Sequence, residues 1–491
     1  MRLNQLLAEI DLQFERASGV EVLDMTLDSR KVADGSLFVA IKGSVGHGMD
    51  YVDSVISSGA SAILYDDWDG EVPKAVPALH VPGLRRKIGR IAHAFYGNPC
   101  AGMNIVGVTG TNGKTTTVHL IAQLAERLGL KAARIGTLGV SVGADKLIES
   151  DRTTPDAITL ASMFNELRSR GVNFVAMEVS SHALDQGRVD GIPFSVGVIT
   201  NLTRDHLDYH GTMEAYGEAK ARLFTDFDLQ AAVFNINDAF CRDLAKRASL
   251  PIVMTYGSGA DQVDIQAIQA TANGSTIRVS VNGVVHELQT SLLGSFNASN
   301  IMAAFAAISA IFPEHSDRAL KAIPTLQAAP GRMEWFRAPE FATVVVDYAH
   351  TPDALENAIK TCRAHCDGEV WSVFGCGGDR DIGKRPLMGA VASELSDHVV
   401  LTSDNPRSES PQAILDDIRS GMSKAPSLEE LDRAKAIRYA VEHASVDDWV
   451  LLAGKGHENT QIIGQKSVVY SDRAEVAQLF GLMGSEVQHA S

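Results

Sequence analysis

The stretch GVTGTNGKTTT, residues Gly107 to Thr117, lies between a predicted strand and a predicted helix. The short apolar run before it, Met103 to Val108, predicts a buried strand. After it, apolar residues recur at helical spacing until Gly129, which predicts a helix that ends there. A strand, a glycine-rich loop and a helix in this order form the setting that a phosphate-binding loop requires.

The residue types within this loop suit the binding of phosphate groups. Its glycines let the backbone turn so that N–H groups point at phosphate oxygens, and the start of the helix adds partial positive charge. Lys114 adds a full charge, and the Thr115 hydroxyl is a ligand for Mg²⁺. Five residues, not four, separate Gly107 from Gly113, so a glycine-rich turn in an α/β domain stays open as the alternative. The predicted nucleotide contacts are Gly110, Thr111, Asn112, Gly113, Lys114, Thr115 and Thr116.

Composition narrows the class of protein. A net charge of −16 over 491 residues argues against nucleic acid or an anionic membrane as the main partner. The N-terminus lacks a signal-peptide core, and the longest helix-like apolar run, Ile301 to Phe312, is shorter than the ~20 residues that span a bilayer. Five cysteines without a CxxC pair indicate free thiols in a reducing compartment. We therefore expect a cytoplasmic protein that is not inserted in a membrane.

Alternating strand-like and helical patterns divide the chain into three predicted α/β domains. Residues 1–98 predict a small α/β domain, 99–332 a central P-loop domain with a mostly parallel sheet, and 333–491 a Rossmann-like domain. The GCGGDR stretch of the last domain is not a dinucleotide fingerprint, because Arg380 stands where the third glycine belongs.

Polar residues follow two apolar strands of the central segment. Glu178 ends one of these strands and His206 follows the other, and ligands bind at the carboxyl ends of open parallel sheets. Both are therefore candidates to complete a Mg²⁺ site near Thr115, with a helix cap or an ion pair as the alternative for Glu178. Lys220 lies in a predicted helix, Met213 to Phe227, and by itself is a typical solvated lysine.

Further motifs occur in one order along the chain, namely GTNGKTT, EVSSHAL, NLTRDHLDYHG, PGRME, DYAHTPD, GCGGDRDIGKRPLM, DNPR and GKGHE. Together they resemble the bacterial Mur ligases over nearly the whole chain. The resemblance implies an ATP-dependent ligase of peptidoglycan synthesis. In this reaction a substrate carboxylate attacks the γ-phosphate of ATP, and an amine then attacks the resulting acyl phosphate to give an amide.

The resemblance also assigns roles around the phosphate loop. Lys114, Glu178 and His206 would act on the transferring phosphate together with Mg²⁺, for which Thr115 is a further ligand. Lys220, fourteen residues after His206, matches a lysine that the family carbamylates with CO₂, which makes it an anionic metal ligand. Further positions that match nucleotide contacts are Asn300, Arg332 and Asp347.

The resemblance implies UDP-N-acetylmuramoyl-L-alanyl-D-glutamate as the nucleotide-sugar substrate. The positions that match its uridine side are Leu27, Ser29 and His47, and those that match its muramoyl dipeptide are Thr153, Thr154, Ser180, Gln186 and Arg188. From the residues alone, Ser29 and His47 are as consistent with ordinary loop positions. Two departures are Arg152, where we expect asparagine, and a longer loop at Ser44 to Met49.

The resemblance implies that the third domain selects the incoming amino acid. meso-Diaminopimelate differs from lysine by a carboxylate, and the Arg407 guanidinium can bind that carboxylate through two parallel hydrogen bonds. Lysine would leave the guanidinium unpaired, so we expect meso-diaminopimelate as the substrate. The full set of predicted contacts is Arg380, Asp404, Asn405, Pro406, Arg407, Gly454 and Glu458.

Three other functions compete with this prediction. A lysine-adding Mur ligase predicts the loss of Arg407, which is present. Folylpolyglutamate synthetase shares the scaffold, but DYAHTPD with DNPR and GKGHE favours the cell-wall branch. A P-loop switch that hydrolyses nucleotide leaves the polar loops of the third domain without a function. We expect the chain to act as a monomer on small-molecule substrates.

Overall fold

The structure is a computed structural model that describes residues 1–14, 17–43, 46–148 and 152–481. Contacts within the chain divide it into two compact units. Unit 1 holds Met1–Tyr256 and Ala303–Ala319, and unit 2 holds Gly257–Met302 and Leu320–Ser491. The predicted α/β class with mostly parallel sheets is confirmed. The domain boundaries 1–98, 99–332 and 333–491 stay predictions.

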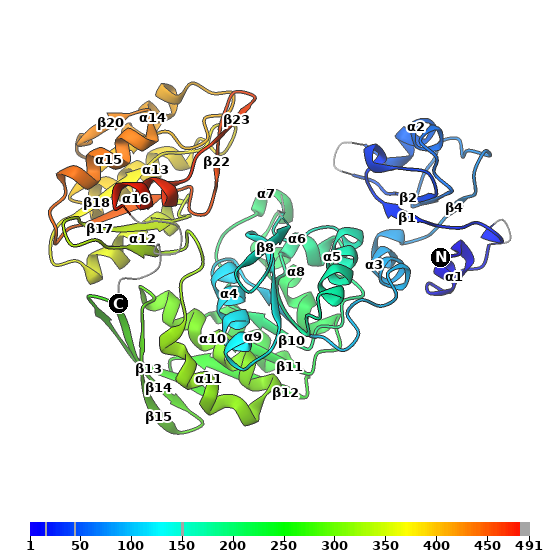
Figure 1. The fold of residues 1–491 in the computed structure, drawn as a ribbon, viewed down its shortest axis with the longest axis horizontal. Coiled ribbons are helices and arrows are strands. Elements are labelled where there is room, and N and C mark those ends of the chain that lie inside the picture. Colours follow the sequence, from blue (N-terminus) through cyan, green and yellow to red (C-terminus); the bar gives the residue numbers. More distant parts are fainter. Residues whose placement is uncertain (15–16, 44–45, 149–151, 482–491) are drawn as a thin grey trace. The chain divides into compact units, whose positions relative to one another are not determined.

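The first part of unit 1 is a small parallel sheet with helices (Figure 1). Its strand order is β1-β2-β3-β4, and all three pairings are parallel. The sheet strands are buried where they carry Leu37, Val39 and Leu64, which pack with the apolar face of α3. The elements here are α1 (Leu3–Ala8), β1 (Asp24–Thr26), β2 (Ser36–Ala40), α2 (Val52–Ser57), β3 (Ala62–Tyr65), β4 (Ala78–His80) and α3 (Leu84–Phe95).

The second part of unit 1 is a larger sheet built around β5. Its strands within unit 1 lie in the order β12-β11-β10-β5-β9-β6-β7-β8, parallel from β12 to β6 and antiparallel for β7 and β8. Its strands are β5 (Asn104–Thr109), β6 (Ala132–Gly136), β7 (Gly139–Val142), β8 (Asp145–Ile148), β9 (Phe174–Glu178), β10 (Val196–Ile199), β11 (Ala231–Asn235) and β12 (Ile252–Gly257). Its helices are α4 (Lys114–Arg127), α5 (Ala157–Ser169), α6 (Ser181–Asp185), α7 (Leu207–His210), α8 (Met213–Thr225) and α9 (Ala239–Arg247).

This strand order brings the loops that carry chemistry to one edge of the sheet. β5 lies between β10 and β9, with Thr109 opposite Ile199 and Val108 opposite Glu178. Because all three strands are parallel, their carboxyl ends meet at the same edge, where ligands bind in open α/β sheets. The predicted strand Met103–Val108 and the helix that stops at Gly129 are confirmed, since β5 and α4 match them closely.

Unit 2 contains an antiparallel meander that the sequence interpretation missed. It consists of β13 (Val263–Thr271), β14 (Gly274–Val281) and β15 (Val284–Thr290). Asn282 and Gly283 both have positive φ, of 49° and 85°, as a tight hairpin turn requires. The Asn-Gly dipeptide between two alternating apolar runs was the signal for this hairpin.

The rest of unit 2 is the expected Rossmann-like sheet, with order β16-β17-β21-β18-β19-β20. Only β16 is antiparallel to its neighbour among these six strands. The strands are β16 (Glu334–Phe336), β17 (Thr343–Asp347), β18 (Val370–Phe374), β19 (His398–Thr402), β20 (Leu428–Glu430) and β21 (Trp449–Ala453). The helices are α10 (Ser295–Ile311) and α11 (Ser316–Ala322), both shared with unit 1, and α12 (Pro352–His365), α13 (Lys384–Leu395), α14 (Pro411–Arg419), α15 (Arg433–His443) and α16 (Asp472–Leu479).

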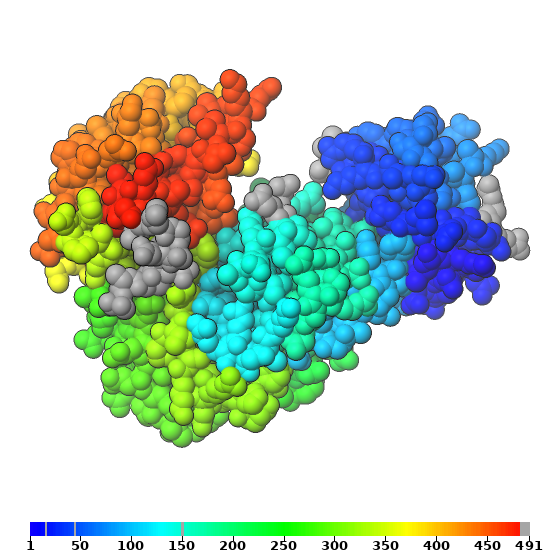
Figure 2. All heavy atoms as spheres, viewed as in Figure 1, coloured from blue at the N-terminus to red at the C-terminus, as the bar shows by residue number. Residues whose placement is uncertain are grey.

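A two-stranded hairpin, β22 (Thr460–Ile463) with β23 (Lys466–Val469), follows the last sheet strand. It projects from the surface of unit 2, and β23 is exposed along its length (Figure 2). No helix in the described ranges combines the length and the apolar character that crossing a membrane requires.

Candidate active site

The phosphate loop lies between β5 and α4, and its backbone depends on glycine. Gly110 has a φ of 142°, and a Cβ there would lie 1.9 Å from the Thr200 Oγ1. Gly113 caps α4 in the left-handed conformation, with a φ of 84°. Any other residue at Gly110 would meet both strain and a steric clash. The first turn of α4, which begins at Lys114, therefore presents its N–H groups beside this loop.

The loop after β10 holds the phosphate loop in place. The Thr111 N–H donates to the Asn201 carbonyl at 3.0 Å, and the Asn112 N–H donates to Asn201 Oδ1 at 2.9 Å. Thr203 donates its N–H to Thr111 Oγ1 at 3.0 Å. These two N–H groups of the phosphate loop thus serve a loop–loop contact. The expectation that successive N–H groups of this loop point at phosphate is wrong for Thr111 and Asn112 in this conformation.

Two lysines converge on one carbonyl of the loop. The Lys114 Nζ donates to the Gly110 oxygen at 2.8 Å, and the Lys220 Nζ donates to the same oxygen at 2.9 Å. Lys220 is 1% exposed, on the face of α8 that also buries Tyr216, so its interpretation as a solvated lysine is wrong. Burial, and then the charge of Lys114, lower the pKa of Lys220 well below its usual value.

His206 lies beside the same group of side chains. Its ring centroid is 4.9 Å from that of His182 and 6.0 Å from that of Tyr216, whose hydroxyl is 3.2 Å from Thr111 Oγ1. Burial lowers the pKa of His206, and the nearby Lys114 and Lys220 lower it further. This lowering, which Asp205 opposes from 3.4 Å, favours the neutral form of His206, whose nitrogen lone pair can accept a proton or bind a metal.

Glu178 lies at the end of β9, where it is 2% exposed. Its carboxylate accepts hydrogen bonds from the Thr137 N–H at 2.9 Å and from the Thr137 hydroxyl at 3.2 Å. The chain passes so close that a Cβ at Gly136 would lie 2.2 Å from Glu178 Oε1. Thr137, which the sequence did not single out, therefore orients this carboxylate.

The predicted metal-binding side chains are few, which fits a metal ion whose other ligands are water and phosphate oxygens. Among the residues that the structure describes, no three His, Cys, Asp or Glu side chains are grouped to hold a metal ion. The predicted set has only Glu178 and His206 of these types, and Thr115 adds a hydroxyl. Mg²⁺ bound to nucleotide keeps several water and phosphate ligands, so one or two protein oxygens suffice.

The five residues predicted to contact the muramoyl dipeptide are brought together. Thr154 is 1% exposed and receives the Ser180 N–H on its hydroxyl at 3.1 Å. The Arg188 guanidinium donates to the Thr154 carbonyl at 2.9 Å and to Gln186 Oε1 at 2.6 Å. Thr153 precedes Thr154 in the chain, and its hydroxyl lies 3.2 Å from that of Thr137. The pKa of Arg188 is lowered by burial and then by the charge of Arg152, so positive charge is concentrated here.

The residues predicted for the uridine side lie in the first part of unit 1. His47 is buried, and its ring is engaged within the chain: Nδ1 accepts from the Met49 N–H at 3.0 Å, and Nε2 lies 2.6 Å from Asp66 Oδ1. Ser29 opens a short 3₁₀ turn capped by Asp28, and Leu27 directly precedes it. Ser44 and Val45, at the start of the lengthened loop, lie outside the described residues. Roles in uridine binding stay predictions for Leu27, Ser29 and His47.

Three predicted nucleotide contacts lie in unit 2. Asp347 ends β17 and accepts the Met333 N–H at 2.7 Å, and burial raises its pKa. The Arg332 guanidinium lies 4.4 Å from the centroid of the Tyr348 ring, and its buried Nε has no hydrogen-bond partner within the described part of the chain. Asn300 is buried in α10 and donates to Asn297 Oδ1 at 3.2 Å. The partnerless Nε of Arg332 is consistent with a ligand that supplies an acceptor.

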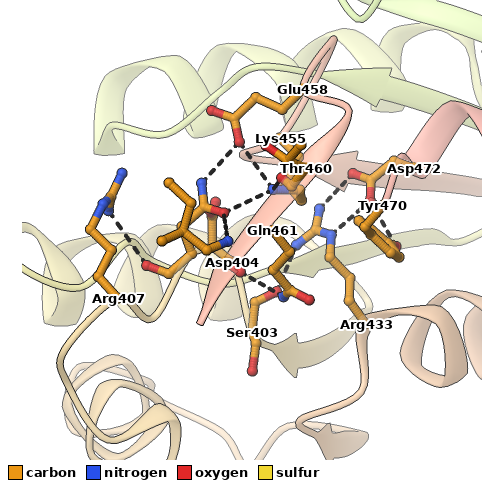
Figure 3. A network of polar contacts seen from close by, with 12 residues as sticks. Ser403, Asp404, Arg407, Arg433, Lys455, Glu458, Thr460, Gln461, Tyr470 and Asp472 are labelled. Carbon is orange, nitrogen blue, oxygen red and sulfur yellow. Dashed lines mark hydrogen bonds and ion pairs between the residues drawn. The ribbon is translucent and has the colours of Figure 1, made fainter. Parts of the chain in front are cut away.

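The DNPR and GKGHE motifs form one polar network at the carboxyl ends of β19 and β21 (Figure 3). The Asn405 Nδ2 donates to Glu458 Oε2 at 2.9 Å. Asp404 is buried, which raises its pKa, and a Cβ at Gly454 would lie 2.7 Å from its Oδ2. In the chain, Pro406 lies between the buried residues Asp404 and Asn405 and the following Arg407.

Arg407 and Arg380 border the same glycine. A Cβ at Gly377 would lie 2.9 Å from Arg407 Nη1 and 3.7 Å from Arg380 Cγ. The Arg407 Nη1 donates to the Gly378 carbonyl at 2.8 Å, and its backbone has a φ of 50°. The Arg407 guanidinium, beside a residue without a side chain, forms a site suited to a carboxylate.

Comparison with known proteins finds relatives over most of the chain. The chain matches three family models, the Mur ligase family catalytic domain over residues 22–96, the Mur ligase middle domain over 108–308, and the Mur ligase glutamate ligase domain over 331–456. Two curated relatives carry the name UDP-N-acetylmuramoyl-L-alanyl-D-glutamate–2,6-diaminopimelate ligase. The protein from Alkalilimnicola ehrlichii is 44% identical, with 98% of this chain and 99% of that protein covered. The protein from Chromobacterium violaceum is 45% identical, with 92% and 93% covered.

Solved structures of related ligases are also similar to this chain. A structure of an enzyme with that name is 35% identical, covers 98% of this chain and 99% of its own, and has a TM-score of 0.71. A Thermotoga maritima ligase solved with ADP is 19% identical, with 89% and 94% covered and a TM-score of 0.64, and shows the shared fold. A Mycobacterium tuberculosis folylpolyglutamate synthase at 18% identity, with 80% and 95% covered and a TM-score of 0.61, also shares the fold.

Proposed function

The chain belongs to the Mur ligase family, and we propose that it is the member that joins meso-diaminopimelate to UDP-N-acetylmuramoyl-L-alanyl-D-glutamate. It is an ATP-dependent ligase of peptidoglycan synthesis that acts on small-molecule substrates. The observation that supports the choice of amino acid is the Arg407 guanidinium, which lies beside Gly377 and the stem of Arg380 and can bind a second carboxylate.

The proposed reaction has two steps. The carboxylate of the D-glutamyl residue attacks the γ-phosphorus of ATP, which forms an acyl phosphate and releases ADP. The amine of diaminopimelate then attacks the acyl carbon, which forms the amide and releases phosphate with loss of the amine proton. Lys114 would neutralise the transferring phosphate, and the other proposed ATP contacts, including Asn300, Arg332 and Asp347, would position the nucleotide.

We propose Mg²⁺ at Thr115, Glu178 and His206, and a CO₂-derived carbamate on Lys220. Mg²⁺ would supply charge neutralisation on the phosphates. Lys220 supports the carbamate because its amine is buried beside Lys114, where the neutral, nucleophilic form is favoured. A carbamate would place an anion able to bind metal beside Lys114, near the Gly110 carbonyl.

Chelation of Mg²⁺ should stop phosphate release, and added Mg²⁺ should restore it. With ¹³C-labelled bicarbonate, we expect a carbamate signal in the ¹³C NMR spectrum that is absent from Lys220→Ala. Lys246→Ala, which removes an exposed lysine from the same unit, should keep the signal. A spectrum that is the same for the parent enzyme and Lys220→Ala would exclude the modification.

We also propose roles for the two groups of unit 1 residues that match nucleotide-sugar contacts. Thr153, Thr154 and Ser180, with Gln186 and Arg188, would hold the muramoyl dipeptide, whose carboxylates suit the positive charge there. Leu27, Ser29 and His47 would lie on the uridine side. We propose further that the enzyme works as a monomer in the cytoplasm. Sedimentation at working concentration would show a dimer if the proposed monomer is wrong.

Phosphate release from ATP in the presence of UDP-N-acetylmuramoyl-L-alanyl-D-glutamate tests the function. We expect turnover with meso-diaminopimelate at least 10²-fold above that with L-lysine, because lysine leaves a guanidinium unpaired. Turnover with lysine instead would assign the lysine-adding reaction and keep the family. Hydrolysis that ignores both amines would contradict the ligase reaction and favour a nucleotide switch.

A further inference from the structure

Lys455 lies in the GKGHE motif, which directly follows β21, and is completely buried. Its ammonium donates to three acceptors within unit 2: Asn405 Oδ1 at 3.2 Å, Glu458 Oε2 at 3.0 Å and the Thr460 carbonyl at 2.8 Å. An ammonium has three donor positions, so all three are used. Removing an ammonium from water costs free energy, and well-placed hydrogen-bond acceptors are needed to offset that cost.

The three acceptors belong to the segments that form the proposed amino-acid site. Asn405 is part of the DNPR loop, Glu458 ends the GKGHE loop, and Thr460 begins β22. Lys455 therefore connects the two site loops and the hairpin through one charged group (Figure 3).

The contacts determine the orientation of both site side chains. Asn405 Oδ1 accepts from Lys455 Nζ and from the Ile462 N–H at 3.0 Å, which directs its Nδ2 to Glu458. Glu458 receives both donors on Oε2, and its other carboxylate oxygen points away from them (Figure 3). Glu458 Oε2 is thus bound by Asn405 and Lys455, whereas Oε1 takes no part in these two hydrogen bonds.

The hairpin extends the same restraint to Arg407. The Gln461 Nε2 donates to the Asp404 carbonyl at 2.6 Å, and the Arg407 N–H donates to the Ile462 carbonyl at 3.1 Å. The Gly464 N–H donates back to the Arg407 carbonyl at 2.7 Å. Since Lys455 binds the first residue of β22, it anchors the strand that holds Arg407 in its left-handed conformation.

We propose that Lys455 is a positioning residue for the incoming amino acid. It does not reach the substrate, because its side chain is fully covered, and it acts by holding Asn405, Glu458 and the start of β22. Burial and the charge of Glu458 raise the pKa of Asp404, and the charges of Arg433 and Lys455 oppose them, so loss of the Lys455 charge would leave the two carboxylates less well compensated. The inference rests on the proposed function and adds a residue to its substrate selection.

Lys455→Met tests the role, since methionine keeps the stem of the side chain and removes the ammonium. We expect the KM for meso-diaminopimelate to rise about 10- to 100-fold, because a small displacement of binding groups has effects of this size. The KM values for ATP and for the nucleotide sugar should stay within about 2-fold, because these bind elsewhere. Lys455→Gln, which retains a neutral donor, should give a smaller rise and serves if the methionine variant does not fold.

Two controls separate positioning from loss of stability. Lys435→Met removes an exposed lysine of α15 and should change nothing. Ile437→Ala creates a cavity in the buried core of the same unit and should lower Tm while leaving the KM for the amino acid unchanged. The inference would be overturned, with the proposed function intact, by either of two results. One is that Ile437→Ala raises the KM for meso-diaminopimelate as much as Lys455→Met does; the other is that Lys455→Met leaves this KM unchanged. A parent enzyme that ignores diaminopimelate would overturn the proposed function and the inference with it.

Discussion

Lys114→Ala is expected to reduce kcat/KM for ATP by about 10³-fold or more. Phosphoryl transfer depends on charge neutralisation and positioning, and removal of one charged donor at the phosphate costs this much in comparable sites. In this structure the Lys114 ammonium bridges the Gly110 and Thr111 carbonyls at 2.8 Å each, directly over the loop that would hold the phosphates. No other side chain of the loop carries a positive charge.

Initial rates of phosphate release over a range of ATP concentrations, with the other substrates saturating, measure the effect, and Tm establishes that the variant folds. The lost hydrogen bonds go to backbone carbonyls of a half-buried loop, so the expected fall in stability is about 1 kcal/mol. Lys246→Ala, at a lysine whose side chain is 70% exposed, is the matched control and should keep full activity. Near-normal activity of Lys114→Ala would mean that the glycine loop does not bind the reacting phosphate.

Arg407→Ala is expected to reduce kcat/KM for meso-diaminopimelate by about 10²- to 10³-fold while leaving the slow rate with L-lysine nearly unchanged. The lost interaction is a charged, bidentate pair in a half-buried site, for which about 3–4 kcal/mol is reasonable. The left-handed backbone at Arg407 is strained for any residue with a Cβ, so alanine adds no new strain.

The ratio of the two rates is the measurement, because it cancels any general loss of active enzyme. Arg407→Lys keeps the charge and removes the planar fork, and it should recover only part of the selectivity. Arg438→Ala, at an exposed arginine of α15, is the control that should leave the ratio unchanged. An unchanged ratio in Arg407→Ala would assign recognition of the second carboxylate to another residue, of which Arg380 is the nearest candidate.

Fold similarity does not identify the amino acid. The folylpolyglutamate synthase structure shares the fold at a TM-score of 0.61, although its name specifies a different product. Selectivity must come from loop residues at the strand ends, where Arg407 and Glu458 lie. For this reason the strongest tests compare substrates and do not depend on the architecture alone.

Local sequence patterns were sufficient for the elements around the phosphate loop. The apolar run of β5, the glycines and the periodic residues of α4 are all close in sequence, and their geometry follows from local backbone preferences. The carboxyl ends of β9 and β10 were also predictable, because a parallel sheet brings such ends to one edge. The order of the strands, with β5 between β10 and β9, was not.

Burial and pairing were decided by contacts between residues far apart in the chain. Lys220 is a normal lysine in an amphipathic helix until α8 packs its face against the Gly110 loop, more than a hundred residues away. Lys455 likewise acquires its partners only when the loops after β19 and β21 meet. Neither short-range periodicity nor composition can predict which acceptor a buried lysine will bind.

The amino-acid sequence by itself was therefore sufficient to predict the phosphate loop, the Mur ligase motifs and the α/β class. The folded chain added which side chains are buried, how each is oriented and which residues support the site, including Thr137, Thr200 and Lys455. The physical reason is that hydrogen-bond direction and desolvation depend on the whole set of neighbours in space, and tertiary packing alone supplies that set.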